Sequence, residues 1–346
     1  MASPMPEVPD YTSRPYDATT TATQLTEKYA SEIKDKTVLV VGASLTSIGG
    51  EFALRIAKAQ PKLIILAGRS TQKLQQAAAA ISTANNAVTS TKILQIDLLS
   101  LSSVREAAAE LLSWDHVPHI DVVMLNAGIM ATEYALSADG FESQFATNHL
   151  GPFLFVNLIM AKVLAAPAPR VVPVSSNGHR LSPIRWADYN FSNGETYNKW
   201  RAYGQSKTAN ILFARSLAAK FGTSHHLQAY SLCPGLVGET QLGAHFADIS
   251  VEIQDMIVLD RELGNIEANL FASNAFQPKT LDVGASTLVT AAFSPDFKDG
   301  NGGFVHDNQL EDLANTWYVK VWARDDFEAE RLWKLSEKLV GQEFGY

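Results

Sequence analysis

Tyr203 and Lys207 are separated by one helical turn in a segment, Trp200–Arg215, that has helical periodicity and no internal proline. On a helix, residues at positions i and i+4 share a face, so the phenol and the ammonium would point in the same direction. A free phenol has a pKa of about 10, and a neighbouring ammonium favours the phenolate and lowers that pKa. The pair is therefore predicted to move a proton to or from a carbonyl or alcohol oxygen near neutral pH. The spacing alone also fits a helix that carries an unrelated tyrosine and lysine on its surface.

The segments around this helix alternate between short apolar strands and longer helices. Thr37–Val41 is β-branched and apolar, which is typical of a parallel strand buried on both faces. Further strands are predicted at Leu63–Ala67, Lys92–Ile96, Ile120–Leu125, Arg170–Val174, Leu227–Cys233 and Gly302–Val305. Helices are predicted between them at Glu51–Ala59, Thr71–Thr83, Leu101–Trp114 and Gly140–Leu164. This alternation predicts an α/β fold, a doubly wound, Rossmann-type parallel sheet of about seven strands with helices on both faces.

Polar and small residues follow the predicted strands, at the edge where ligands bind in open α/β sheets. The turn Gly42–Gly50 offers backbone amides and a helix N-terminus, which suit a pyrophosphate, although a purely structural turn would look the same. Arg69 ends the second strand with no acidic residue directly before it, and an arginine there suits the 2′-phosphate of NADP(H). Asp97, after the third strand, would contact the adenine or cap the next helix. These residues together predict a dinucleotide site.

Composition limits the classes of partner. The 346-residue chain has a formal net charge of −8 and no basic run, so nucleic acid is not an expected partner. The single cysteine, Cys233, cannot form an intramolecular disulfide, which favours a reducing, cytoplasmic setting. The longest apolar run, Leu150–Pro167, contains polar residues, so no membrane span is expected. The histidines lack the spacing of metal ligands, no metal is expected, and His149 is expected to pack or cap.

A single domain is expected over residues 36–346, preceded by an N-terminal extension at residues 1–35. Residues 1–21 are rich in proline, threonine and serine and are interpreted as a mobile arm. The alternation stops after Gly238, and residues 238–275 are interpreted as an insertion that forms a lid over a substrate. Additional helices are predicted at Ala22–Ser31, Ile249–Leu259, Ile266–Ala272, Leu281–Phe293 and Asp325–Val340.

The region Lys36–Thr240 resembles the short-chain dehydrogenase/reductase superfamily through six motifs that occur in the order of that superfamily. They are Gly42-x6-Gly49 with Ile48, Asp97-Leu98, Asn126-Ala-Gly128, Asn148, Ser176 with Tyr203-x3-Lys207, and Pro234-Gly235. The segment Tyr203–Phe213 resembles the retinol-dehydrogenase-like branch, including its fungal members. The glycine turn departs from the usual pattern by one extra residue and by Ser47 in place of a glycine.

The resemblance implies a role for each motif. Tyr203 would be the acid or base, and Lys207 would modulate its pKa and bind the ribose. Ser176 would hydrogen-bond the substrate oxygen, and Asn148 would hold a proton-relay water. The implied contacts to NADP(H) come from Gly42, Ser44, Ser47, Ile48, Gly49, Arg69, Asp97, Leu98, Asn126, Gly128, Tyr203, Lys207, Pro234, Gly235, Val237 and Thr240.

The implied activity is NADP(H)-dependent interconversion of a carbonyl and a primary or secondary alcohol by hydride transfer. The length and mixed polarity of the lid segment indicate a bulky, fairly apolar small-molecule substrate, such as a secondary metabolite. Retinol itself is not implied, because the apolar anchor of membrane-bound retinol dehydrogenases is not expected here. Two alternatives remain open, namely a non-redox step such as dehydration, epimerisation or cyclisation at the same site, and a binding protein without turnover. Formation of a homo-oligomer is also left open.

Overall fold

Six parallel strands form the central sheet, in the order β3-β2-β1-β4-β5-β6. The computed structural model describes residues 16–265, 278–313 and 318–345. The strands are β1 (Thr37–Val41), β2 (Leu63–Gly68), β3 (Ser90–Gln95), β4 (Val122–Leu125), β5 (Arg170–Pro173) and β6 (Gln228–Ala229). After β3 the chain returns to the middle of the sheet, so the strand order reverses between β1 and β4. The prediction of a doubly wound α/β fold is confirmed, and the reversal marks the usual place for a ligand.

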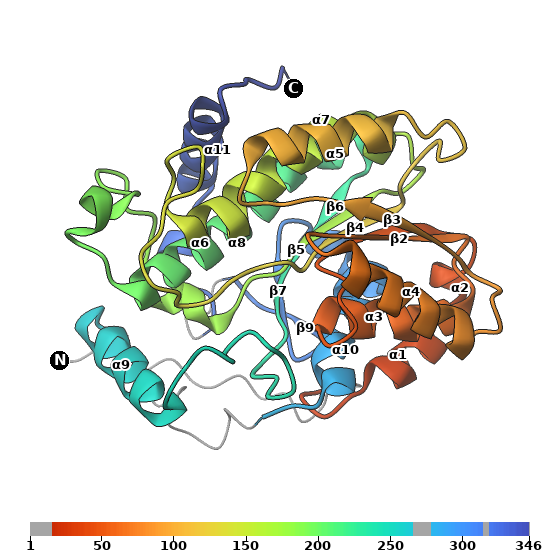
Figure 1. The fold of residues 1–346 in the computed structure, drawn as a ribbon, viewed down its shortest axis with the longest axis horizontal. Helices are drawn as coiled ribbons and strands as arrows, with labels where there is room; N and C mark the ends of the chain where they lie inside the picture. The colour runs from red at the N-terminus through yellow and green to blue at the C-terminus, as the bar shows by residue number, and fades with distance from the viewer. Residues whose placement is uncertain (1–15, 266–277, 314–317, 346) are drawn as a thin grey trace.

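Alternate residues of each strand face opposite cores, which explains why the strands are apolar throughout. Leu39 and Val41 of β1 belong to one buried cluster, whereas Val38 and Val40 belong to the other. The first face is covered by α5 (Leu101–Leu112), α7 (Gly151–Leu164) and α8 (Lys199–His225) (Figure 1). The second face is covered by α3 (Ile48–Ile56), α4 (Thr71–Ala84) and α10 (Leu281–Phe293).

The predicted strand Leu227–Cys233 is divided into β6 and β7 (Ser231–Cys233). The division occurs because the hydrogen-bond partner changes at Tyr230. The Tyr230 amide donates to Val171, while the Ser231 amide donates to Gly303. A three-stranded sheet follows, in which β7 pairs with β8 (Phe304–His306) and β8 pairs with β9 (Gln309–Leu310). A bridge between Val174 and Leu232 keeps β7 beside the end of β5.

The predicted helix Gly140–Leu164 is interrupted by a π-helical turn. The segment contains α6 (Ser143–Phe145), then the π-turn η2 (Ala146–Leu150), and then α7. The Glu142 carboxylate caps the N-terminus of α6 by accepting hydrogen bonds from the amides of Gln144 and Phe145. A π-turn adds one residue to the helix, and such turns are frequent at functional sites. The apolar pattern of the sequence does not reveal this insertion.

The remaining helices lie outside these layers. α1 (Ala22–Lys28) packs on α10 and α3, and the Thr23 hydroxyl donates to Asp282 at 2.9 Å. α11 (Asp326–Val340) packs on α8, while α9 (Ile249–Glu262) lies to one side in Figure 1. Short pieces are α2 (Ala30–Ile33) and the 3₁₀ turns η1 (Ala57–Ala59), η3 (Asn177–Leu181), η4 (Phe191–Gly194), η6 (Pro295–Gly300) and η7 (Val321–Ala323). The predicted helix Ile266–Ala272 and most of the predicted arm lie outside the described residues.

Candidate active site

Tyr203 lies against the segment after β5 that carries Ser176. The Ser176 hydroxyl accepts a hydrogen bond from the Gly178 amide at 3.0 Å and is also hydrogen-bonded to the phenol of Tyr203. A β-carbon on Gly178 would lie 2.6 Å from a ring carbon of Tyr203, so a side chain at this position would displace the phenol. Ser175, by contrast, is buried and its hydroxyl donates to the Lys207 carbonyl at 2.7 Å. Ser176 is therefore the serine that is available beside the phenol.

Lys207 lies one turn after Tyr203, on the same side of α8. Its Nζ is 5.6 Å from the centre of the Tyr203 ring and donates to the Val174 carbonyl at 3.1 Å. A β-carbon on Gly128 would lie 3.4 Å from this Nζ and 3.0 Å from the side-chain oxygen of Asn148. The loop after β4 thus passes directly over both side chains. Together with the Ser176 contacts, these distances bring the four predicted catalytic residues into one cluster.

Asn148 occupies the π-turn η2, and all of its side-chain hydrogen-bond donors are used. The side-chain oxygen accepts from the Ile129 amide at 2.8 Å, and the nitrogen donates to the Ile129 carbonyl at 2.9 Å. The same nitrogen donates to the Ser206 hydroxyl at 2.9 Å, and that hydroxyl donates to the Tyr203 carbonyl at 2.8 Å. Asn148 therefore ties the loop after β4 to α8. Ser206 was not predicted, and only its position next to Lys207 could have indicated it.

Burial controls the protonation of the phenol and the ammonium. It raises the pKa of Tyr203 well above the ordinary value of a phenol, and the hydrogen bond with Ser176 offsets this only in part. Burial also lowers the pKa of Lys207 to about 8. The predicted lowering of the Tyr203 pKa is not found, because desolvation, which penalises the charged form, is the largest influence on the phenol and on the ammonium. Tyr203 is therefore a neutral phenol at pH 7.

The lowered pKa of Lys207 predicts a dependence of stability on pH. The folded protein releases this proton near pH 8, whereas the unfolded chain keeps it up to the ordinary pKa of 10.5. The unfolded state binds more protons in this window, so the free energy of unfolding should rise by about 2 kcal/mol between pH 7 and pH 9.5. Urea denaturation should show this gain for the wild type relative to Lys207→Met, in which the other titrating groups are the same. An identical pH dependence of the two proteins would contradict the burial of the ammonium.

Ser47 closes the turn between β1 and α3. Its hydroxyl lies 2.9 Å from the Gly42 carbonyl oxygen and 2.7 Å from that of Ser44, and it accepts from the Gly50 amide at 3.0 Å. The serine thus caps α3, which begins at Ile48 rather than at the predicted Glu51. A hydroxyl can satisfy these backbone groups and a glycine cannot, which is a physical reason for the departure from the usual glycine pattern.

The glycines of this turn permit a close approach to the neighbouring strand. Gly42 has φ +91°, and a β-carbon there would lie 2.5 Å from the Ala127 amide nitrogen. The Asn126 side-chain nitrogen donates to the Gly42 carbonyl at 3.0 Å, and a β-carbon on Gly49 would lie 2.7 Å from that nitrogen. The amides of Ile48 and Gly49 open α3 and have no acceptor within the helix. A helix start with free amides suits a pyrophosphate.

Arg69 directly follows β2 and is exposed. Its carbonyl accepts from Gln95 at 3.4 Å, but within the described residues its guanidinium makes no hydrogen bond or ion pair. The guanidinium is therefore free to bind an anion. Asp97 is half-buried and accepts from the Leu99 amide at 3.1 Å, while Leu98 is buried beside α7. Asp97 and Leu98 follow β3, so they lie at the same edge of the sheet as Arg69, which follows the parallel strand β2.

The segment after β7 completes this edge. Pro234 directly follows the strand, and Gly235 has φ +85° with Lys279 packed against it. Val237 is buried and forms a bridge with Lys279, and the Thr240 hydroxyl donates to the Val237 carbonyl at 3.2 Å. Because β7 runs parallel to the extension of β5, these residues lie at the same edge as the turn after β1.

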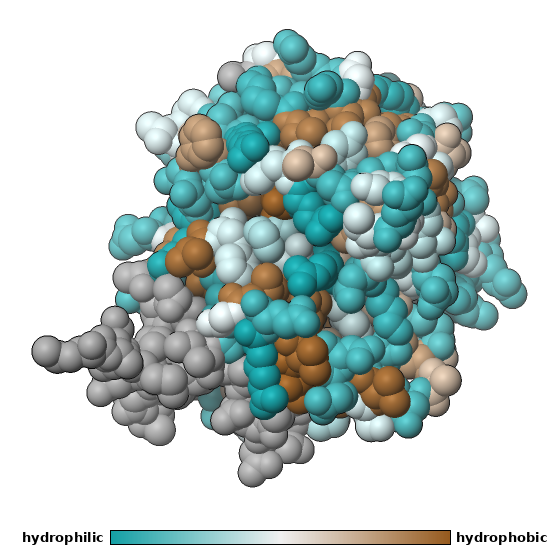
Figure 2. Space-filling model, turned by 90° about the vertical axis from the view of Figure 1, so that its left-hand side faces the viewer, coloured by the Kyte–Doolittle hydropathy of each residue, from teal (hydrophilic) through white to brown (hydrophobic). Residues whose placement is uncertain are grey.

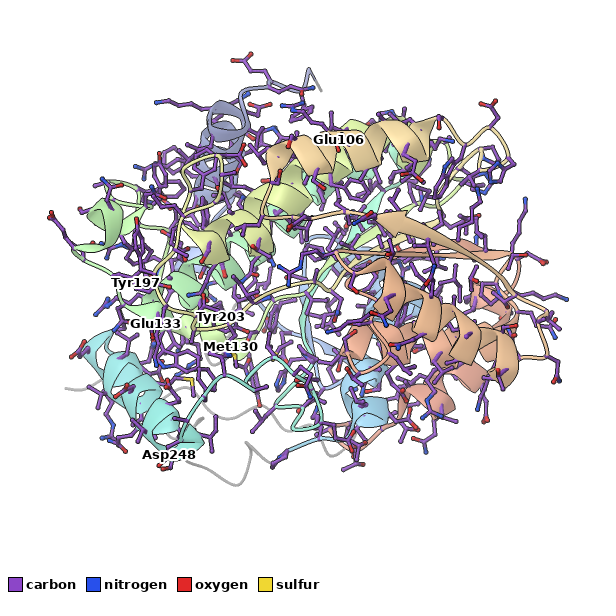
Figure 3. All side chains as sticks on the ribbon, in the orientation of Figure 1. Glu106, Met130, Glu133, Tyr197, Tyr203 and Asp248 are labelled. Carbon is purple, nitrogen blue, oxygen red and sulfur yellow. The ribbon has the colours of Figure 1, made fainter. Side chains whose placement is uncertain are left out.

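The segment after Gly238 forms an apolar cover over Tyr203. The ring centres of Tyr203 and Trp200 are 6.1 Å apart with the rings nearly perpendicular, and those of Phe246 and Trp200 are 5.7 Å apart. The buried cluster consists of Ala131, Leu181, Trp200, Tyr203, Met256, Ile257 and Leu259, with Met130, Phe246, Ile253 and Leu263 around it. Tyr203 is only 5% exposed. Figure 3 shows it beside Met130, with Asp248 at the start of α9.

Polar contacts attach α9 to the elements that carry the candidate residues. Arg180 and Asp260 form an ion pair at 2.9 Å in which both side chains are 0% exposed. The Glu252 carboxylate accepts from Lys199 at 2.6 Å and from the Trp200 indole at 3.0 Å. On the outside, apolar residues form separate groups among polar ones (Figure 2). The ion pairs of Arg180 with Asp260 and of Lys199 with Glu252 were not predicted, because the partners are far apart in the sequence.

His149, His179 and Cys233 are buried side chains. Burial lowers the pKa of His149 and of His179 to about 3, so both rings are neutral at pH 7. Cys233 is buried and free, as predicted, and its sulfur accepts from the Asn177 amide at 3.3 Å. Residues 16–265, 278–313 and 318–345 contain no group of three or more side chains arranged to hold a metal ion.

In the part of the chain that the structure describes, each helix is too short or too polar to cross a bilayer.

A doubly wound parallel sheet with a small-residue turn after its first strand defines the class of dinucleotide-binding α/β proteins. Within that class, residues 36–248 match the family model of the short chain dehydrogenases, and the chain belongs to this family. Members of the family are oxidoreductases that use a nicotinamide cofactor.

Curated relatives confirm the resemblance to the retinol-dehydrogenase-like branch. The chain is 32% identical over 326 residues to Oxidoreductase calI of Penicillium decumbens, which covers 90% of this chain and 89% of the relative. It is 34% identical over 317 residues to retinol dehydrogenase 14 of Mus musculus, which covers 88% of this chain and 86% of the relative. These similarities extend well beyond the motifs at the sheet edge.

Solved structures show the same fold. The crystal structure of an uncharacterized protein from Mycobacterium Paratuberculosis has a TM-score of 0.66 and 30% identity, and covers 92% of this chain and 98% of that chain. A short chain dehydrogenase from Escherichia coli CFT073, complexed with NADPH, has a TM-score of 0.56 and covers 81% of this chain and 99% of that chain. The identity to the second protein is 19%, so this likeness concerns the fold alone.

Proposed function

We propose that the protein is an NADP(H)-dependent oxidoreductase that interconverts a carbonyl and an alcohol. The observation that carries this proposal is the buried contact of Tyr203 with Ser176, one helical turn from Lys207. The free amides at the start of α3 lie at the same edge of the sheet and would hold the pyrophosphate. When bound, the nicotinamide would supply or accept the hydride at the substrate carbon.

Tyr203 and Ser176 would act on the substrate oxygen. In the reducing direction, the neutral phenol of Tyr203 donates its proton to the carbonyl oxygen as charge develops there. The Ser176 hydroxyl hydrogen-bonds the same oxygen and stabilises that charge. In the oxidising direction, Tyr203 accepts the alcohol proton.

Lys207 and Asn148 would support the phenol after it has lost its proton. Among the described residues the ammonium of Lys207 makes one hydrogen bond, to Val174, so its remaining donors would bind the ribose and its charge would stabilise the phenolate. Both donors of the Asn148 side chain are already used by Ile129 and Ser206. A relay water at Asn148 would therefore be held at an oxygen atom rather than by the side-chain nitrogen.

The preference for NADP(H) is proposed from the free guanidinium of Arg69. Replacement by Ala should raise the Kd of NADPH about 10- to 100-fold, because one charge-assisted contact to the 2′-phosphate is lost. The Kd of NADH should change little, since NADH has no phosphate at this position. Fluorescence titration of both dinucleotides with the wild type and Arg69→Ala measures this difference. Equal losses for NADPH and NADH would remove the argument for the 2′-phosphate.

A bulky, fairly apolar substrate is proposed from the residues that cover Tyr203. Trp200, Phe246 and Met256 contribute aromatic and thioether side chains, which match large apolar surfaces. The test is NADPH consumption with a panel of aldehydes and ketones of increasing apolar size, followed by identification of the alcohol product. Binding of NADPH without its consumption by any substrate would favour a binding protein or a non-redox reaction instead.

A further inference from the structure

His149, the residue after Asn148, connects the π-turn η2 to the C-terminal helix α11. Its Nε2 lies 2.8 Å from the Ser336 hydroxyl of α11. The ring is 1% exposed and packs against Phe153 and Phe213. Within the described residues its Nδ1 has no hydrogen-bond partner, so Ser336 supplies the side-chain hydrogen bond of the ring. The neutral imidazole therefore depends on α11 for its polar contact.

The π-turn is held from two sides. A π-turn is rare because its geometry is less favourable than that of a regular α-helix, and it persists where surrounding contacts determine it. Asn148 fastens the turn to Ile129 and Ser206, whereas His149 fastens it to Ser336. A shift of this turn by one residue toward α-helical register would rotate the Asn148 side chain by about 100° around the helix axis. Asn148 would then lose its contacts with the loop after β4 and with α8.

We propose that Ser336 is a positioning residue that, through His149, holds η2 in the register that places Asn148 in the candidate active site. The inference rests on the proposed function, because it gives α11 a role only if Asn148 supports the reaction. α11 is also hydrogen-bonded to α8, where the Ser216 hydroxyl donates to the Ala329 carbonyl at 3.0 Å. Ser216 is 4% exposed and Ser336 is 0% exposed, so the two hydroxyls are comparably buried, and each makes a hydrogen bond that docks α11.

The test compares Ser336→Ala with Ser216→Ala in NADPH-dependent reduction of the best carbonyl from the panel. Ser336→Ala should lower kcat about 10-fold, because Asn148 is displaced by a fraction of an ångström, while the KM for NADPH stays unchanged. Ser216→Ala should leave kcat unchanged. Both variants should lower Tm by a similar amount, since each removes one buried hydrogen bond of α11. Equal losses of kcat in the two variants would show that docking of α11 matters in general, and would overturn the positioning role.

An independent measurement does not require turnover. Hydrogen–deuterium exchange of the peptide that covers η2 should become faster in Ser336→Ala and remain as in the wild type in Ser216→Ala. Unchanged exchange of this peptide in both variants would overturn the inference even if the activity of the protein were lost for another reason.

A double-mutant cycle separates this inference from the proposed function. Asn148→Ala alone should lower kcat, and an unaffected kcat would refute the role proposed for Asn148. In the Asn148→Ala background, Ser336→Ala should cause no further loss, because it acts only through the asparagine. The same fold loss in both backgrounds would contradict the positioning role of Ser336 while leaving the role of Asn148 intact.

Discussion

Tyr203→Phe is expected to lower kcat by about 10²- to 10⁴-fold, the range that general acid–base catalysis contributes. The substitution removes one oxygen atom and keeps the ring, which remains packed beside Gly178 and Trp200. The hydroxyl of Ser176 is left without its phenol partner, and the proton that the phenol would donate is lost. The affinity for NADPH should therefore change little, because the phenol acts on the substrate oxygen.

Tyr197→Phe is the matched control for this experiment. The Tyr197 hydroxyl donates to the Thr132 carbonyl at 2.8 Å and accepts from Gln144 at 2.9 Å, outside the cluster of candidate residues. Its loss should lower Tm and leave kcat close to that of the wild type. NADPH titration and thermal unfolding of both variants distinguish a lost proton donor from a damaged fold. A Tyr203→Phe protein with full activity would refute the assignment of the acid.

Asp260→Ala is expected to lower the free energy of unfolding by about 3–5 kcal/mol, the usual cost of removing one partner from a buried ion pair. The cause is that Arg180 would keep its charge in a fully buried position without the carboxylate at 2.9 Å. The attachment of α9 beside Tyr203 would weaken at the same time, so the KM for an apolar substrate should rise. Urea denaturation at pH 7 and steady-state kinetics measure the two effects.

Glu262→Ala provides the comparison on the same helix. Glu262 pairs with Arg201 at 3.2 Å, but the two side chains are 59% and 30% exposed, so this pair contributes about 0–1 kcal/mol. A loss for Asp260→Ala no larger than that for Glu262→Ala would mean that the buried pair does not hold α9. Asp260→Asn, which keeps hydrogen-bonding capacity, replaces Asp260→Ala if the latter does not fold.

Local patterns made much of the fold predictable from the sequence. Thr37–Val41 and Leu281–Phe293 have the predicted bounds, because an uninterrupted apolar run and the helix-capping Thr280 are both local signals. The convergence of the candidate residues was also predictable. Parallel strands bring their carboxyl ends to one edge, so residues that follow β1, β4 and β5 must lie near one another whatever separates them in the chain.

Features that depend on distant contacts were not predictable. The break at Tyr230 arises because the next amide binds Gly303, more than seventy residues later in the printed sequence. The π-turn around Asn148 is a single inserted residue in an apolar stretch, and hydrophobic periodicity is too coarse to show it. The direction of the pKa shift of Tyr203 depends on burial under residues such as Met256, which belong to a separate part of the chain.

Arg180 belongs to the segment directly after Ser176, whereas Asp260 belongs to α9. A chimera that takes only one of these segments from another family member would keep only one partner of this buried ion pair, which is destabilising. Laboratory evolution of new substrate ranges in this scaffold would therefore need to recombine both segments as one unit. Diversity introduced at Met256 or Ile253, which take no part in the pair, would reshape the cover without that penalty.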